Sequence, residues 1–252
     1  MTNEVRDETV IGFNGAELAV HRMGSGKPVL LLHGLFSSAQ MNWIRFGHAQ
    51  KLADAGFEAI MPDLRAHGNS AKPHDPMGYA PDVLVKDAQA VAEQLGLEDY
   101  DLVGFSLGAR TAVRCVLAGM APRRVVLAGM GLEGLTGWDR RAAFFIDAID
   151  RFDEVRHGDP AFMAVQFMKT MKVDRLAARQ LLQSVEDTAP DKLGEVTMPV
   201  LLVCGNQDTD NGSPEALVAA LPDAALEPVP GTHMSSVTEP ALGDAIVRFL
   251  AA

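Results

Sequence analysis

The sequence predicts an α/β fold, with a mostly parallel sheet flanked by helices and a helical segment inserted near its middle. Short apolar runs alternate with helical patterns along most of the chain. These runs are apolar at consecutive positions, as in strands that are covered on both faces. The helical patterns between them are long enough to form the crossovers that connect parallel strands.

The chain begins with a predicted β-hairpin. Residues 9–13 and 17–22 resemble strands, and the Asn14-Gly15 pair between them is typical of a two-residue hairpin turn. Beyond the hairpin, strands and helices alternate. We expect strands at 28–33, 57–63, 100–106, 123–130, 199–205 and 224–230. We expect helices at 41–56, 81–96, 107–119, 213–222 and 240–252.

One region interrupts this alternation. From about Gly131 to Leu193 the sequence contains only helical patterns, at 139–152, 159–171 and 174–187. We therefore predict an α/β core formed by residues 1–130 and 194–252, with a helical lid or cap at 131–193.

The predicted lid is rich in phenylalanine and has one apolar helical face. It contains five of the 11 phenylalanines of the chain. The face of its first helix consists of Ala142, Phe145, Ile146, Ile149 and Phe152. Packing of amphipathic helices on the core accounts for part of this pattern. An apolar lid over a pocket is compatible with the rest.

Composition excludes several classes of partner. The 252-residue chain has a formal net charge of -11, which disfavours nucleic acid and anionic membranes as partners. Its apolar runs are far shorter than the ~20 residues of a membrane span, and its first ten residues lack a secretory signal pattern. The two cysteines, Cys115 and Cys204, lie far apart in apolar segments, as buried reduced thiols do. We expect an acidic, globular, cytoplasmic protein.

The segment "GFSLG", Gly104 to Gly108, is the strongest chemical signal. Random placement of 23 Gly around nine Ser gives about 0.07 such matches. The motif follows a predicted strand and precedes a predicted helix. This is the context of a strained turn that presents Ser106 as a nucleophile. A glycine-rich structural turn is the alternative.

A serine nucleophile needs a base and an acid that orients the base. Of seven histidines, only His233 lies in a loop directly after a strand and before the last helix. His33 ends a buried strand, which favours a structural role, and His67 and His74 fall in a polar loop. The loop after the preceding strand offers Asp208 and Asp210 as the acid. The resulting order of Ser, Asp and His is that of one hydrolase architecture.

From about residue 9 to its end, the chain resembles the α/β-hydrolase fold enzymes of the large esterase-like superfamily. The matching motifs occur in family order, with an insertion where the family has its lid. They are His33-Gly34, "DLRAHGNS" (63–70), "GFSLG", Gly205-x-x-Asp208 and Gly231-x-His233. One departure is Ala66, where the family usually has Gly. That loop is mostly structural in the family, so the change puts little in doubt.

This resemblance implies a role for each residue. Ser106 attacks an acyl carbon, His233 carries the proton, and Asp208 orients the imidazole. The backbone N–H groups of Leu35 and Leu107 form the oxyanion hole. Family spacing favours Asp208 over Asp210, and Glu133 holds the place where some members keep their acid.

The function that the resemblance implies is cofactor-independent hydrolysis of a carboxylic ester through an acyl-enzyme. Serine at the nucleophile position argues against haloalkane dehalogenase and epoxide hydrolase chemistry, which use Asp there. An apolar substrate of small to medium size fits the expected pocket side chains, which are Phe36, Phe144, Phe145, Met163 and Phe167. Hydrolysis of a C–C bond, an amide or a lactone, perhydrolysis, and a non-catalytic receptor that keeps the triad remain alternatives.

No cofactor or metal is expected. "GMGLEG" (129–134) matches the dinucleotide fingerprint literally, but no partner strand follows it, so it does not fit a βαβ unit. No pair of His or Cys has the spacing of metal ligands.

Overall fold

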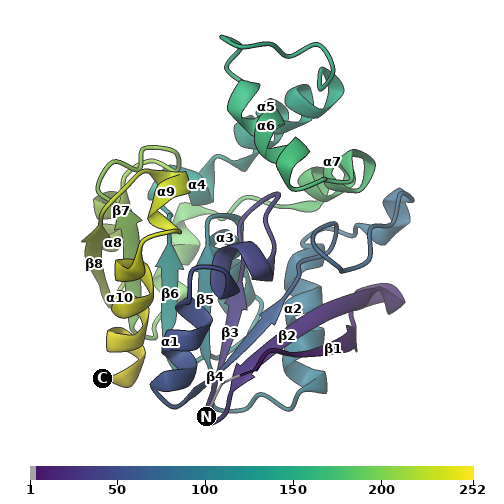
Figure 1. The fold of residues 1–252 in the computed structure, drawn as a ribbon. Coiled ribbons are helices and arrows are strands. Elements are labelled where there is room, and N and C mark those ends of the chain that lie inside the picture. The colour runs from purple at the N-terminus through teal and green to yellow at the C-terminus, as the bar shows by residue number, and fades with distance from the viewer. Residues whose placement is uncertain (1–3) are drawn as a thin grey trace.

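The computed structural model describes residues 4–252, which form one eight-stranded sheet in the order β1-β2-β4-β3-β5-β6-β7-β8 (Figure 1). Only the pairs β1–β2 and β2–β4 are antiparallel, and all other neighbours are parallel. The predicted fold class is therefore confirmed. Residues 1–3 of the predicted core lie outside the described residues.

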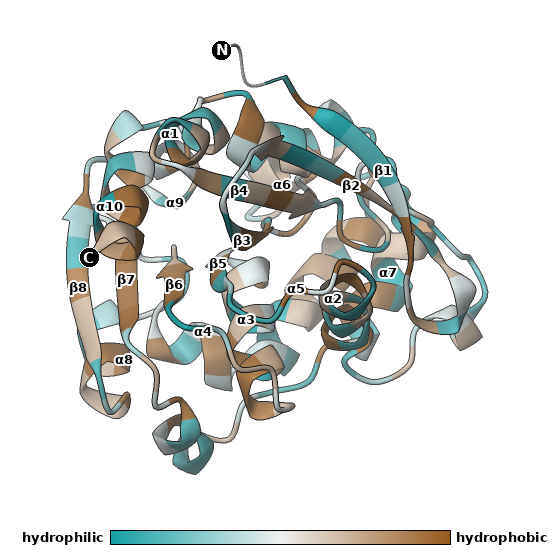
Figure 2. Cartoon of the chain, turned by 90° about the horizontal axis from the view of Figure 1, so that it is seen from below, coloured by the Kyte–Doolittle hydropathy of each residue, from teal (hydrophilic) through white to brown (hydrophobic). Residues whose placement is uncertain are grey.

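All the predicted strands are present. The strands are β1 (Arg6–Ile11), β2 (Glu17–Gly24), β3 (Lys27–Leu32), β4 (Phe57–Pro62), β5 (Asp101–Phe105), β6 (Val125–Ala128), β7 (Val200–Gly205) and β8 (Ala224–Val229). Every residue of β5, β6 and β7 is buried, as the unbroken apolar runs predict. Viewed from below, β6 and β7 are hydrophobic, while edge strand β1 is largely hydrophilic (Figure 2).

The N-terminal hairpin forms with a longer connection than predicted. Ile11 pairs with Glu17, so residues 12–16 make the turn in place of Asn14-Gly15 alone. Phe13 is fixed there, because its N–H donates to Asp87 (2.9 Å) and its carbonyl accepts from Arg65 (2.6 Å). These tertiary hydrogen bonds override the local preference for a two-residue turn.

Helices cover both faces of the sheet. Helices α1 (His48–Asp54) and α10 (Pro240–Ala251) pack on one face, and their buried side chains join those of alternate strand positions. Helices α2 (Val83–Gln94), α3 (Leu107–Leu117) and α8 (Pro214–Ala220) pack on the other. None of the described helices is long and apolar enough to cross a membrane.

The helix predicted at 41–56 is divided into two parts. A π-helical turn at Gln40–Ile44 precedes α1, and Gly47 between them has a left-handed backbone (φ 80°). Asn42 in the π-helical turn is buried, and its Oδ1 accepts a hydrogen bond from the Gly34 N–H (3.1 Å). The interruption thus directs a polar side chain inward, toward the loop after β3.

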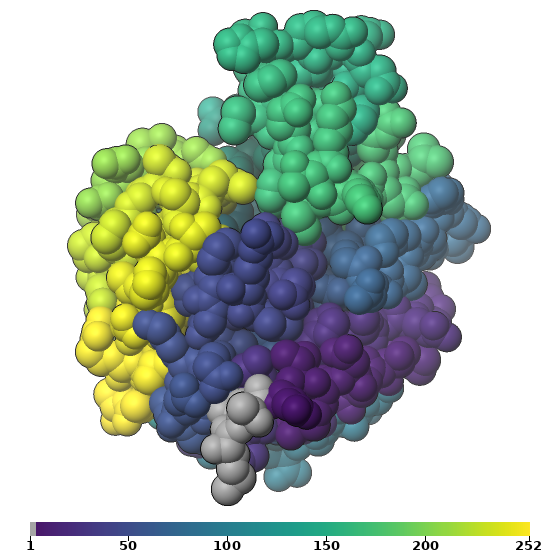
Figure 3. All heavy atoms as spheres, viewed as in Figure 1, coloured from purple at the N-terminus to yellow at the C-terminus, as the bar shows by residue number. Residues whose placement is uncertain are grey.

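Between β6 and β7 the chain forms helices joined by loops, and residues 129–199 contain no strand. The helices are α4 (Leu132–Thr136), α5 (Trp138–Asp150), α6 (Phe162–Thr170), α7 (Arg175–Ser184) and the 3₁₀ turn Pro190–Glu195. Helices α5, α6 and α7 project beyond the carboxyl ends of the parallel strands (Figure 1). In the space-filling view the same segment stands out at the top of the molecule (Figure 3). The apolar face of α5 packs inward, with Ala142 and Ile149 buried and Phe145, Ile146 and Phe152 partly buried against the main core.

Arg110 of α3 ties both ends of this helical segment to the core. Its side chain is 1% exposed, donates to the Leu135 carbonyl (2.5 Å) and pairs with Asp187 (2.6 Å). It also lies over the ring of Trp138 at 5.0 Å. Because α3 begins directly after Ser106, the segment is anchored to the helix that follows the serine.

Candidate active site

Ser106 occupies a strained turn between β5 and α3. Its backbone (φ 53°, ψ −113°) lies in a region that non-glycine residues rarely adopt. The flanking glycines are steric requirements, as predicted. A Cβ at Gly104 would lie 2.3 Å from the Gly108 carbonyl carbon, and a Cβ at Gly108 would lie 2.0 Å from the Leu32 carbonyl oxygen. The strand and the helix therefore approach each other only because neither glycine has a side chain.

Ser106, His233 and Asp208 form one hydrogen-bonded chain. The Ser106 Oγ lies 3.0 Å from His233 Nε2, and His233 Nδ1 lies 2.9 Å from Asp208 Oδ2. His233 begins the short helix α9 (His233–Ser236) after β8, and Asp208 lies in the loop after β7. With Nδ1–H donated to the carboxylate, Nε2 is free to accept the serine proton.

The structure separates Asp208 from the other two candidate acids. Asp210 is exposed, and its N–H donates to Asp208 Oδ1 (3.0 Å). Glu133 accepts a hydrogen bond from the Ser213 N–H (2.8 Å). Burial raises the pKa of Asp208, but the hydrogen bond and charge of His233 outweigh burial and leave that pKa below its ordinary value. Asp208 is therefore ionised at neutral pH.

Two backbone donors lie beside the serine. Leu107 is the first residue of α3, where N–H groups have no acceptor within the helix. The loop after β3 also passes close by, since a Cβ at Gly34 would lie 3.5 Å from the Ser106 Cβ. The N–H of Leu35, the next residue, has no hydrogen-bond partner within residues 4–252. The loop that carries Leu35 and the first residue of α3, Leu107, therefore both adjoin Ser106, and their role as oxyanion donors stays a prediction.

The sequence profile of the alpha/beta hydrolase family matches residues 29–243. The chain belongs to this family. The matched range includes all five motifs on which the predicted resemblance rests.

The relatives of this α/β hydrolase differ in activity. It is 36% identical over 106 residues to "Epoxide hydrolase 2" of Siraitia grosvenorii, covering 42% of this chain and 33% of that protein. It is 30% identical over 140 residues to "N-formylmaleamate deformylase" of Pseudomonas putida, covering 54% and 50%. These matches span half or less of the relatives' lengths. A thermophilic esterase from Thermogutta terrifontis shares the fold, with a TM-score of 0.78, 21% identity and 98% coverage of both chains.

In this α/β hydrolase, the loop that carries Leu35 is held by two buried histidines. His33 Nε2 accepts from the Leu64 N–H (2.9 Å), and His67 Nε2 accepts from the Phe36 N–H (2.9 Å). Their Nδ1 atoms donate to the carbonyls of Gly34 and Arg65. Burial lowers the pKa of both histidines, that of His67 to about 3, so both are neutral. The structural role expected for His33 is consistent with these contacts.

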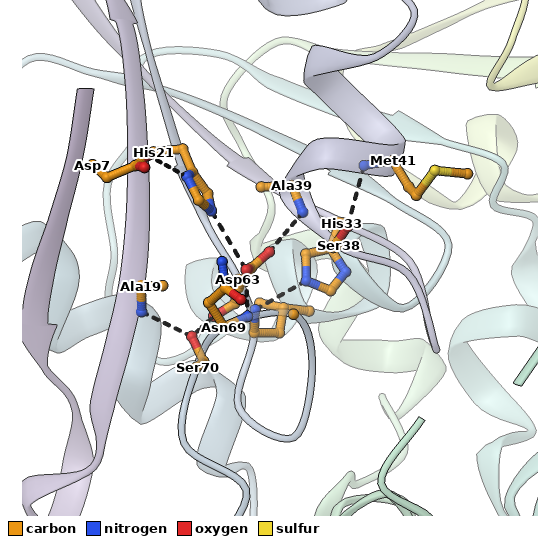
Figure 4. A network of polar contacts seen from close by, with 12 residues as sticks. Asp7, Ala19, His21, His33, Ser38, Ala39, Met41, Asp63, Asn69 and Ser70 are labelled. Atoms are coloured by element: carbon orange, nitrogen blue, oxygen red, sulfur yellow. Dashed lines mark hydrogen bonds and ion pairs between the residues drawn. The ribbon is translucent and has the colours of Figure 1, made fainter. Parts of the chain in front are cut away.

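Asp63 is the centre of a second set of contacts that support the same loop (Figure 4). It accepts from the N–H groups of Ala39 and Asn69, both at 2.8 Å, and lies 3.4 Å from His21 Nε2. Burial raises the pKa of Asp63, but these donors hold it well below its usual range. The hydrogen bond to Asp63 raises the pKa of His21 to about 9, with a further contribution from Asp7 at 2.6 Å.

His67 is the residue whose role the sequence concealed. The sequence places it in a polar loop, yet it is 3% exposed, and its ring lies edge-on to His33 at 5.1 Å. No local pattern in the sequence indicates that its Nε2 accepts a hydrogen bond from the backbone N–H of Phe36. Phe36 and His67 lie 31 positions apart along the chain, so only the fold brings this donor to its acceptor.

The predicted pocket side chains lie in different surroundings. Phe36 is buried, and its ring packs edge-on against Phe145 at 5.4 Å, while Phe144 lies next to Phe145 at 5.2 Å. Phe167 is partly buried against the main core. Met163 is 74% exposed. Phe36 and Phe145 therefore join the helical segment to the loop beside Ser106, and a pocket role for Phe144, Met163 and Phe167 stays a prediction.

The surface also has a hollow of about 620 Å³ that lies away from Ser106. It lies between the β1–β2 turn and residues 71–78. The buried guanidinium on its wall, Arg65, is already paired with Asp87 (2.7 Å). We therefore place the site at the hydrogen-bonded chain of Ser106.

Within residues 4–252, no three His, Cys, Asp or Glu side chains are grouped to hold a metal ion.

Proposed function

We propose that this α/β hydrolase is a serine hydrolase that cleaves a carboxylic ester of a small to medium apolar substrate through an acyl-enzyme. The observation that supports this is the hydrogen-bonded chain from Ser106 through His233 to Asp208, built on the strained turn after β5. Strain at Ser106 orients its hydroxyl before substrate arrives, which is the function of such a turn.

In the first half of the proposed reaction, Ser106 Oγ attacks the ester carbon while His233 Nε2 takes the hydroxyl proton. The carbonyl π electrons move to oxygen, and the N–H groups of Leu35 and Leu107 stabilise this oxyanion. Asp208 stabilises the imidazolium that forms. When the carbonyl re-forms, the C–O bond to the alcohol breaks, and the alcohol leaves with the proton from His233.

In the second half, water attacks the acyl-enzyme and gives a proton to His233 Nε2. The second oxyanion accepts hydrogen bonds from the same backbone N–H groups, those of Leu35 and Leu107. Its collapse breaks the bond to Ser106, whose oxygen recovers the proton from His233, and the carboxylic acid leaves. The ionised state of Asp208 at neutral pH supports both halves, because both pass through a cationic imidazole.

Serine at the nucleophile position distinguishes this proposal from the activity named for the epoxide hydrolase relatives. As the resemblance implies, epoxide hydrolase chemistry in related families uses Asp at this position, whereas this chain has Ser106. The deformylase and esterase names fit acyl transfer to water, which Ser106 chemistry can perform. C–C bond, amide or lactone hydrolysis and perhydrolysis would use the same three side chains.

We further propose that residues 131–193 act as a cap over Ser106. Helix α5 supports this, because Phe145 packs against Phe36, which directly follows Leu35. A cap at this place excludes water and supplies apolar contacts for the acyl or alcohol group. We also propose that the protein acts in the cytoplasm on a small molecule and needs no cofactor.

A panel of 4-nitrophenyl esters of increasing acyl length tests the proposed activity, with Ser106→Ala as the control. We expect turnover to fall by about 10⁴–10⁶ in kcat in Ser106→Ala. A fluorophosphonate probe should label the natural chain and not the variant. Absence of labelling and of Ser106-dependent turnover would favour a receptor that keeps the triad without catalysis.

Three substitutions test the identity of the acid. Asp208→Asn should lower kcat by about 10²–10⁴, because the amide favours the wrong imidazole tautomer. Glu133→Gln and Asp210→Asn should leave it within about threefold, since neither side chain contacts His233. The reverse pattern would transfer the role to another carboxylate.

A further inference from the structure

Helix α5 connects the two loops that flank Ser106. Arg141 Nη1 donates to the Asp210 carbonyl (2.5 Å), in the loop that carries Asp208. One turn later on the same face of α5, Phe145 packs against Phe36, in the loop that carries Leu35. Ser106 lies between these loops, because it is bonded to Asp208 through His233 and adjoins Gly34. The Arg141–Phe145 face of α5 therefore contacts both loops next to Ser106.

Arg141 is a half-buried guanidinium without a carboxylate partner. Within residues 4–252 it makes no ion pair, whereas buried Arg65 and Arg110 pair with Asp87 and Asp187 at 2.7 and 2.6 Å. Its one hydrogen bond, to a backbone carbonyl, uses one of five N–H donors. The guanidinium also lies 5.6 Å from the centre of the Phe145 ring. Burial lowers the pKa of Arg141, and the charges of Asp210 and Asp208 offset this only in part.

The acidic groups near Arg141 are not available to neutralise it directly. Asp208 Oδ2 is bonded to His233 and Oδ1 to the Asp210 N–H, so this carboxylate is committed to the catalytic group. Asp210 is exposed and offers its carbonyl. The guanidinium donors that remain free suit a planar anion that would arrive with a ligand.

We propose that Arg141 binds a free carboxylate of the substrate, so that the preferred ester is the half-ester of a dicarboxylic acid. The inference rests on the proposed ester hydrolysis. Phe36 and Phe145 contact the apolar chain between the scissile ester and the carboxylate. Arginine suits this role, because its fork of N–H donors pairs with both oxygens of a carboxylate.

The experiment compares half-esters with neutral esters of equal length. Monomethyl succinate, adipate and suberate are each paired with the methyl alkanoate whose acyl chain ends in a methyl group instead of the carboxylate. Hydrolysis is followed by proton release in a pH-stat. The proteins are the natural chain, Arg141→Gln, Arg141→Lys and Arg140→Gln. Arg140 is the matched control, since it is the adjacent, exposed arginine of the same helix.

We expect at least one half-ester to be preferred over its neutral partner by 10-fold or more in kcat/KM. Arg141→Gln should reduce this preference by about 10–100-fold, mainly through KM, as expected for a lost charge-assisted contact. Arg141→Lys should retain part of the preference, and Arg140→Gln all of it.

Two results would overturn the inference while ester hydrolysis stands. One is equal kcat/KM for the two members of every pair. The other is a parallel loss on both members in Arg141→Gln, which would make Arg141 only a tie between α5 and the Asp210 loop. If Ser106 also resists the fluorophosphonate probe and no ester is turned over, both proposals are wrong.

Discussion

His233 and His67 are both buried histidines that follow strands of the sheet, and each bonds to a loop beside Ser106. His67 has both nitrogens bonded to backbone groups, since Nδ1 donates to Arg65 and Nε2 accepts from Phe36. His233 has one nitrogen on a carboxylate and the other on a hydroxyl. A backbone N–H cannot give up its proton, whereas a hydroxyl can. The partner of Nε2 therefore distinguishes the proposed base, His233, from a structural support, His67.

His21 adds a third state to this comparison. Both its nitrogens face carboxylates, Asp7 at 2.6 Å and Asp63 at 3.4 Å, and the pKa rises to about 9. A histidine held in its charged form has no lone pair to accept a proton at neutral pH. In the proposed mechanism the one carboxylate at His233 orients a neutral imidazole, whereas the two carboxylates at His21 make its imidazole a cation that serves as an ion-pair partner.

The largest expected effect is that of His233→Gln. Loss of the base should lower kcat on a 4-nitrophenyl ester by about 10⁴–10⁶. The free energy of unfolding should change by no more than about 2 kcal/mol. Initial rates and urea unfolding measure the two quantities. Residual activity above one percent of the natural chain would show that another group accepts the serine proton.

The sequence was sufficient to predict the strands, the tight turn at Ser106 and the positions of Asp208 and His233 in loops next to it. These features depend on local signals, because a buried parallel strand is an apolar run and its loop must lie at the carboxyl edge of the sheet. The two glycines around Ser106 are equally local, since each avoids a clash with the neighbouring strand or helix.

Features that depend on long-range contacts could not be predicted. The turn at 12–16 is set by Arg65 and Asp87, more than 50 positions away along the chain. The left-handed Gly47 that divides the helix at 41–56 resembles, in sequence, an ordinary helix glycine. In the sequence, Arg141 is typical of a surface residue of an amphipathic helix, and only the fold brings it to the Asp210 carbonyl.

The next largest effect is that of His67→Leu, on stability. The substitution leaves the Phe36 N–H and the Arg65 carbonyl without partners in a buried place. We expect the free energy of unfolding to fall by about 2–4 kcal/mol, measured in urea. His74→Leu is the control, because His74 is exposed and its pair with Asp174 contributes about 0–1 kcal/mol. Equal losses in the two variants would contradict a supporting role for His67.

A smaller effect is the pH dependence that His21 confers. Its pKa is about 9 when folded, above the ordinary 6.5. Its contribution to the free energy of unfolding is therefore complete below pH 6.5 and is lost as the pH rises through 9. The side chain is 11% exposed, so we expect about 2 kcal/mol between pH 7 and 10. The difference in unfolding free energy between the natural chain and His21→Gln should shrink over this range. Parallel curves would mean that His21 is not charged in the folded state.

The smallest effect concerns Ala66, next to His67. It has a left-handed backbone (φ 70°) and is 2% exposed, at the place where the family usually has Gly. Ala66→Gly relieves about 1 kcal/mol of backbone strain in the folded protein. Against this, it removes a buried methyl group that contributes about 0.8 kcal/mol to stability, and it raises the conformational entropy of the unfolded chain. We expect a net change within about 1 kcal/mol in urea unfolding. Ala66→Val, a β-branched residue in the same conformation, should destabilise by more than 2 kcal/mol. A loss of that size in Ala66→Gly itself would mean that packing of the methyl outweighs backbone strain at this position.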